Sequence, residues 1–185
     1  KVDISTDMVD LVLIVDDVIS LSKSLANINN ISIEYQIIPD GNIFAEVDPL
    51  RFKQVVLNLI SNAIKYNEPN GSVVVSFEKL ENSQIRLGVK DTGHGIPDDK
   101  KDKIFKPFER FDMNSEHIEG TGIGLSISQK LIELMNGSIG FESVTGKGSF
   151  FYVDVPVSDK IPLPGQLEKQ SGSVQLSLKK NKIKK

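Results

Sequence analysis

The sequence contains no cysteine or tryptophan, and it has only two histidines, His94 and His117. The lack of cysteine excludes disulfides, thiol catalysis and cysteine metal sites, and it agrees with a reducing compartment. No apolar run approaches the roughly 20 residues of a membrane-spanning helix, and residues 1–10 show no signal-peptide pattern. The net charge of −3 is small, so charge gives no reason to expect nucleic acid or a membrane surface as a partner.

The composition is that of an ordinary soluble protein, with 39% hydrophobic and 25% charged residues. A length of 185 residues is enough for one domain with a core and a short extra segment. We place the domain at residues 9–157, after an N-terminal segment at 1–8 and before a linker and basic tail at 158–185, whose Ser, Gln and Lys content predicts disorder. Because the chain does not start with methionine, we expect a fragment of a longer protein. The expected location is the cytoplasm, and an upstream anchor in the inner membrane stays open.

The spacing of apolar residues predicts both helices and strands. Apolar residues at helical spacing predict helices over 9–26, 48–66 and 121–135. Alternating or apolar runs predict strands over 31–38, 43–47, 72–80, 84–90, 137–143 and 149–155. Two hairpins favour antiparallel pairing. The expected fold is therefore α/β: a two-layer sandwich of one mixed, mostly antiparallel sheet with helices on one face.

A polar stripe accompanies the apolar one on the helix that starts at Asp48. Asn58, Asn62 and Lys65 are four and three residues apart, so they share one helix face. Carboxamide oxygens suit Mg²⁺, which binds through few protein groups plus phosphate, and lysine supplies a point charge for phosphate. The alternative is a solvated helix face, which is less natural because asparagine is a mediocre helix former.

A glycine-rich loop, Asp91-Thr-Gly-His-Gly95, directly follows a predicted strand. A carboxylate at Asp91 can accept a hydrogen bond from the exocyclic amine of adenine. Gly93 and Gly95 permit close approach of the backbone. An ordinary strand-to-helix turn is the alternative, and we interpret His94 as a loop residue because no nucleophile accompanies it.

Aromatic and basic residues mark the segment 104–111. The spacing of Phe105, Phe108 and Phe111 is helical, and we expect the first two to lie in the core. Lys106 and Arg110 are cations that either face phosphates or are simply solvated. The polar residues 112–119 that follow have little to bury and are expected to form a mobile loop.

The segment Gly120-Thr-Gly-Ile-Gly124 opens the last predicted helix. Free N–H groups and the helix dipole make such an end an anion site, which glycines let phosphates approach. A dinucleotide fingerprint is excluded because a polar loop, not a strand, precedes it. A phosphate-binding P-loop at 140–148 is excluded because its glycine spacing is one residue too long and Gly148 follows Lys147.

Together, the four segments resemble the sequence boxes of sensor histidine kinases. NLISNAIKY at 58–66 resembles the N box, DTGHG at 91–95 the G1 box, FKPF at 105–108 the F box and GTGIGL at 120–125 the G2 box. The resemblance covers about residues 9–157. It implies the ATP-binding (Bergerat) fold that these kinases share with DNA gyrase and the heat-shock-chaperone ATPases.

The resemblance also implies roles for individual residues. Asn62 would bind Mg²⁺ with support from Asn58, Lys65 would reach phosphate, Tyr66 would line the base pocket and Asp91 would bind the adenine amine. The catalytic residues would be Asn58, Lys65 and Arg110, with residues 112–119 as the lid. The remaining nucleotide contacts would be Gly93, Gly95, Ile96, Gly120, Thr121, Gly122, Gly124 and Leu125.

The implied function is delivery of the γ-phosphoryl group of Mg-ATP to a histidine on a dimerisation domain that this chain lacks. That domain and a response regulator receiver domain are the expected partners, nucleic acid is not, and a monomeric fragment of a homodimeric parent is expected. Related ATPases have a glutamate base at Asn58; asparagine cannot take a proton, which favours transfer over hydrolysis. A degenerate signalling module and a stand-alone ATPase or serine kinase stay open as alternatives.

Overall fold

The computed structural model describes residues 3–36, 42–81, 83–108 and 122–157. Strands β2, β4, β5, β7 and β6 form a five-stranded sheet in that order, in which only β2 and β4 are parallel, and β1 pairs with β3 in a separate ribbon. The elements are β1 (Asp7–Asp10), α1 (Leu11–Ile28), β2 (Ser32–Gln36), β3 (Phe44–Val47), α2 (Pro49–Lys65), β4 (Ser72–Leu80), β5 (Gln84–Asp91), α3 (Asp98–Lys101), α4 (Gly124–Leu134), β6 (Ser138–Val144) and β7 (Gly148–Pro156).

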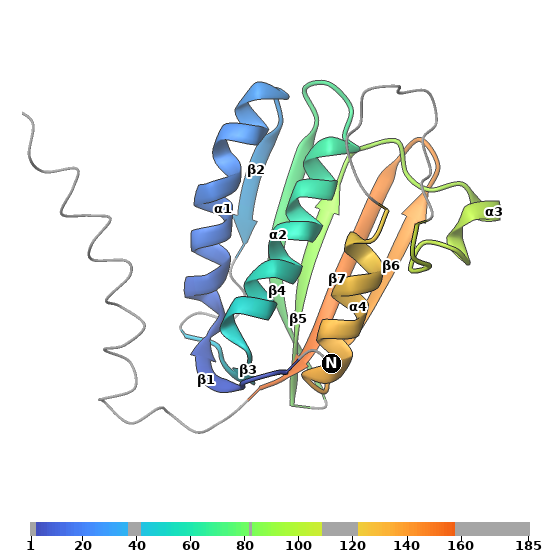
Figure 1. Cartoon of the computed structure of the whole chain (residues 1–185). Helices are drawn as coiled ribbons and strands as arrows, with labels where there is room; N and C mark the ends of the chain where they lie inside the picture. Colours follow the sequence, from blue (N-terminus) through green and yellow to red (C-terminus); the bar gives the residue numbers. More distant parts are fainter. Residues whose placement is uncertain (1–2, 37–41, 82, 109–121, 158–185) are drawn as a thin grey trace, which may run out of the picture.

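Helices α1, α2 and α4 cover one face of the five-stranded sheet (Figure 1). The alternation along β5 explains which face they cover: Ile85, Leu87 and Val89 are buried, whereas Arg86 between them is only half-buried. The two-layer α/β sandwich expected from the sequence is confirmed.

Helix α2 forms where the sequence places it. The Asp48 side chain accepts a hydrogen bond from the Arg51 backbone N–H at 3.0 Å, and Pro49 occupies the first turn, where its missing N–H costs nothing. The buried stripe of the helix consists of Phe52, Val55, Val56, Leu59, Ile60, Ala63 and Ile64. These residues pack on the sheet, so the polar stripe beside them is held in a fixed orientation.

The start of the first helix differs from the prediction. The helix begins at Leu11, because Asp10 is its N-cap and accepts a hydrogen bond from the Val12 N–H at 3.0 Å. Val9, predicted as helical, instead pairs with Ala45 in the β1–β3 ribbon. Strand β1 therefore begins before the predicted domain boundary at residue 9, and that boundary stays a prediction.

Helix α4 also begins later than predicted, at Gly124 rather than residue 121. Gly122 has a φ of 69°, a left-handed conformation that does not continue into a helix. The predicted lid at 112–119, Arg110, His117, Gly120, Thr121 and the tail at 158–185 lie outside the described residues. No helix in the described part of the chain is long and apolar enough to cross a membrane.

Candidate functional site

Asp91 ends β5 with its side chain almost completely buried, at 6% exposure. Its Oδ1 accepts hydrogen bonds from the backbone N–H groups of Gly93 at 2.9 Å and Ser149 at 3.1 Å. Burial raises the pKa of the Asp91 carboxyl above its ordinary value, and the two backbone hydrogen bonds and nearby His94 oppose that rise. Oδ1 is thus committed to the backbone, and no hydrogen bond to Oδ2 is seen among the described residues.

The loop after Asp91 packs tightly against the end of α2. The His94 N–H donates to the Tyr66 carbonyl at 3.2 Å, and a Cβ at Gly93 would overlap that same carbonyl oxygen. Thr92 Oγ1 donates to Asn67 Oδ1 at 3.0 Å, and Asn67 Nδ2 donates to the Ala63 carbonyl at 3.0 Å. Glycine is thus required here by the protein's own backbone.

The other side of the loop is held by the β6–β7 hairpin. The Ile96 N–H donates to Ser143 Oγ at 2.8 Å, and the two buried hydroxyls of Ser143 and Ser149 lie 3.0 Å apart. Gly95 has a φ of 67°, and a Cβ there would overlap the Val144 carbonyl. The loop carrying Gly93, Gly95 and Ile96 is therefore fixed on two sides.

Asn58 connects α2 to the start of α4. Its Nδ2 donates to Ser128 Oγ at 2.9 Å, and a Cβ at Gly124 would overlap Asn58 Oδ1. A cavity of about 270 Å³ lies at this junction, lined by Gln54, Leu57, Asn58, Ser61, Gly124, Ile127 and Ser128. The structure thus brings together two of the predicted site residues, from the first and the fourth sequence segments.

Other predicted residues lie apart from this cavity. Asn62 is half-buried one turn further along α2, Lys65 is exposed, and Tyr66 is 39% exposed. Neither Asn62, Asp91 nor Gly122 lines the cavity. A common pocket around those three stays a prediction.

Comparison with known proteins identifies the family. The family model described as "Histidine kinase-, DNA gyrase B-, and HSP90-like ATPase" matches residues 47–159, more than half of the chain. The chain belongs to this family. Within it, the relatives place the chain with the ATP-binding domains of sensor histidine kinases.

Among these relatives, the adaptive-response sensory kinase SasA of Prochlorococcus marinus is 40% identical over 119 residues, covering 64% of this chain and 31% of that protein. The catalytic domain of histidine kinase ThkA is 31% identical with a TM-score of 0.71, covering 82% of this chain and 95% of that one. ThkA in complex with response regulator TrrA is 28% identical with a TM-score of 0.69, and the match covers 84% of this chain and 42% of that one. The chain spans under a third of the length of SasA.

The described residues have the chemistry that an adenine nucleotide needs. Asp91 offers a buried carboxylate, and Gly93 and Gly124 are glycines whose missing side chains bring the backbone into close contact with Tyr66 and Asn58. In the described part of the chain, no group of three or more His, Cys, Asp or Glu side chains is placed to hold a metal ion. Asn58 and Asn62 supply neutral amide oxygens one turn apart on α2.

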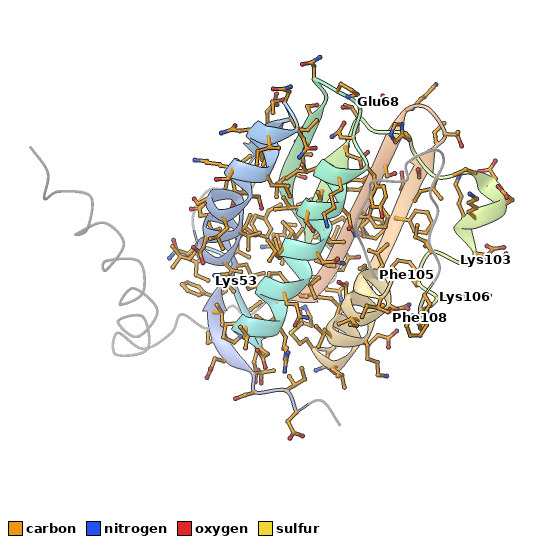
Figure 2. The ribbon with its side chains drawn as sticks, turned by 45° about the horizontal axis from the view of Figure 1, so that its top comes forward. Lys53, Glu68, Lys103, Phe105, Lys106 and Phe108 are labelled. Atoms are coloured by element: carbon orange, nitrogen blue, oxygen red, sulfur yellow. The ribbon has the colours of Figure 1, made fainter. Side chains whose placement is uncertain are left out.

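Neither phenylalanine of the F-box segment belongs to the hydrophobic core, although both were expected there. Phe105 is half-buried, and its ring lies 5.9 Å from that of Phe141 in an edge-to-face arrangement. Phe108, predicted as core, is 80% exposed and has a φ of 66°. Figure 2 shows Phe108 beside Lys103 and Lys106 at one edge of the molecule. The core prediction for Phe108 is wrong because helical structure ends at Lys101, so helical spacing does not apply.

Three polar residues that hold predicted site residues in place were missed by sequence reasoning. Asn67 ties α2 to the Asp91 loop, Ser143 holds Ile96, and Ser128 holds Asn58. Only Ser128 had a sequence feature that could have indicated its role. It is a polar residue on the same helical face as Leu131 and Ile132, which are buried. A polar residue on an apolar stripe points to a hydrogen-bond partner.

Proposed function

We propose that this domain binds Mg-ATP and, within a longer sensor kinase, presents the γ-phosphoryl group to a histidine on a dimerisation domain. The observation that carries the proposal is Asp91: a buried carboxylate with one oxygen held by two backbone N–H groups and the other left for a ligand. A buried acceptor of this kind matches an exocyclic amine donor, as in adenine.

The phosphates would lie toward the start of α4. That helix begins at Gly124, and the backbone N–H groups of its first turn, together with the helix dipole, favour an anion. Asn62 would hold Mg²⁺, with Asn58 beside it and Lys65 as the nearby cation. The ion would neutralise the charge of the triphosphate. The role of the protein would then be to bind the nucleotide and orient its γ-phosphate.

Asn58 favours transfer to a protein acceptor over hydrolysis. A carboxamide cannot take a proton from water, so Asn58 would orient polar groups without acting as a general base. Catalysis would then consist mainly of positioning the γ-phosphate and excluding water from it. Arg110, which lies outside the described residues, would add a cation.

The partners follow from the same reasoning. The histidine-bearing dimerisation domain would be the acceptor, and a response regulator receiver domain would take the phosphoryl group next. ThkA, which this domain resembles, was solved with the response regulator TrrA, which supports a partner of that kind.

The test is a nucleotide titration followed by a transfer assay. The isolated chain is titrated with ATP in the presence and absence of Mg²⁺, and radiolabelled ATP is then supplied with a histidine-bearing dimerisation domain. We expect binding that requires intact Asp91 and transfer of label to the acceptor histidine. Binding without transfer would indicate a degenerate signalling module. Steady phosphate release by the isolated chain would indicate an ATPase, and absence of binding would overturn the proposal.

A further inference from the structure

Ser128 is a buried hydroxyl on the inner side of α4. It is 2% exposed and lies on the same helical face as Leu131 and Ile132, which are 3% and 0% exposed. An unpaired hydroxyl in such surroundings is costly, so its cross-helix hydrogen bond is informative. That contact is with Asn58: the Nδ2 group donates to Ser128 Oγ at 2.9 Å, between residues 70 positions apart.

The contact distinguishes the two ends of the Asn58 carboxamide. The amide group has a donor end and an acceptor end of nearly the same shape, and only hydrogen-bond partners decide which end points where. With Nδ2 directed at Ser128, Oδ1 faces Gly124 at the start of α4. A rotation of the amide by half a turn would place a donor where the oxygen now lies.

A serine that only filled the core would bond within its own helix. Ser22 on α1 does so: its hydroxyl is 3% exposed and donates to the Val18 carbonyl at 2.8 Å, one turn back. Ser128 instead accepts from a neighbouring helix, and both partners line the α2–α4 cavity.

We propose that Ser128 is a positioning residue, which fixes the carboxamide of Asn58 with its oxygen toward the N-terminal end of α4 and thereby sets the rate of phosphoryl transfer. The proposal rests on the function proposed above. It predicts that loss of the hydroxyl lowers the catalytic rate more than nucleotide affinity, since the amide is misdirected while the base-binding end of the site is unchanged.

The first test needs no activity. In the nucleotide-free chain, the Asn58 side-chain amide protons are observed by NMR in wild type, Ser128→Val, Ser128→Ala and Ser128→Thr. We expect hydrogen-bonded, slowly exchanging Nδ2 protons in wild type and Ser128→Thr, and fast exchange in the other two variants. Equal exchange in wild type and Ser128→Ala would overturn the proposal. Ser128→Ala is included because valine is larger than serine and could disturb the packing of the two helices.

The second test measures transfer to a supplied histidine-bearing dimerisation domain. We expect kcat to fall about tenfold in Ser128→Val and Ser128→Ala, with KM for ATP within about twofold of wild type and recovery in Ser128→Thr. Ser22→Val is the matched control, a buried serine whose loss should leave kcat unchanged.

Unchanged kcat in Ser128→Ala, or failure of threonine to restore it, would contradict a positioning role. Failure of the wild-type chain to bind ATP or transfer phosphate would count against the proposed function instead. In that case the amide-exchange result still decides whether Ser128 orients Asn58.

Discussion

The carboxylate of Asp91 accepts a hydrogen bond from the backbone N–H of Ser149 at 3.1 Å, although 58 residues separate the two in sequence. This bond makes the orientation of the aspartate depend on the β6–β7 hairpin. The same hairpin holds the next part of the loop through Ser143 and Ile96. The adenine-recognition group proposed here is therefore positioned by the last hairpin of the domain.

The first prediction concerns pH. Burial raises the pKa of the Asp91 carboxyl above 3.8, so on acidification it is protonated at a higher pH than an ordinary aspartate. The buried charge of Asp91 destabilises the folded state. This destabilisation is absent at pH values below the ordinary pKa of aspartate and complete at pH values above the raised pKa. Binding of adenine needs the ionised form, so ATP affinity should fall as pH is lowered through the raised pKa.

Titration of the chain with ATP at a series of mildly acidic pH values measures this effect. Asp91→Asn is the control, because it lacks the titrating group and should show a flatter pH profile. Equal pH profiles in the two proteins would contradict a role for the Asp91 charge.

A second prediction concerns the hairpin's hold on the loop. Ser143→Ala removes the acceptor of the Ile96 N–H, which leaves that buried donor unpaired. We expect a loss of about 1–3 kcal/mol in the free energy of unfolding, together with faster hydrogen exchange at the Ile96 amide. Ser138→Ala, on the same strand but exposed, should change neither quantity. Unchanged exchange at Ile96 in Ser143→Ala would show that the bond does not hold the loop.

A third prediction concerns the sheet face opposite the helices. Arg86 makes two hydrogen bonds of 2.8 Å to the carboxylate of Asp154 and lies 3.8 Å over the ring of Tyr152. Asp154 is 6% exposed, so Arg86→Ala would leave a buried charge without its partner. We expect a loss of about 3 kcal/mol in the free energy of unfolding, measured by urea denaturation.

Arg86→Lys separates charge from geometry in this pair. Lysine keeps the charge but cannot form the two-pronged contact, so its loss of stability should lie between those of wild type and alanine. ATP affinity of the folded variants should stay unchanged, because this face is remote from Asp91 Oδ1 and its loop. A lysine variant as unstable as the alanine variant would contradict a contribution of the Arg86 charge to the stability of this pair.

A fourth prediction concerns the start of α2. Asp48 caps the helix through the Arg51 N–H and also accepts from the Ser5 N–H at 3.1 Å through its second oxygen. Asp48→Asn keeps the cap and loses the second contact, whereas Asp48→Ala loses both. We expect alanine to be less stable than asparagine by about 1 kcal/mol in thermal denaturation. Equal stability would show that the cap contributes nothing.

The sequence predicted well the elements with local signals. Asp48-Pro49 and the apolar stripe behind it located α2 to within one residue, because capping and periodicity act over a few neighbouring positions. The β1–β3 ribbon was missed, since its four-residue strands are short and Val9 fits the periodicity of the next helix. Phe108 shows the reverse error, where helical spacing was assumed beyond the end of a short helix.

The site was predictable only as far as its residues carry sequence motifs. Asp91, Asn58 and Gly124 belong to such motifs, and the structure joins the last two. The supports of these residues, Ser128 and Ser143, reach them through hydrogen bonds across 70 and 47 positions. Such pairings depend on how helices and hairpins pack, which local patterns do not determine.

The most direct test of the account is the ATP affinity of Asp91→Asn against that of wild type. Asparagine can still accept the N–H groups of Gly93 and Ser149, but it presents a donor where Oδ2 now lies. We predict that calorimetric titration gives ATP binding weaker by at least about tenfold without loss of thermal stability. Asp98→Asn, on an exposed side chain, should bind as wild type does. ATP binding by Asp91→Asn as tight as by wild type would contradict the central claim that Asp91 selects the base.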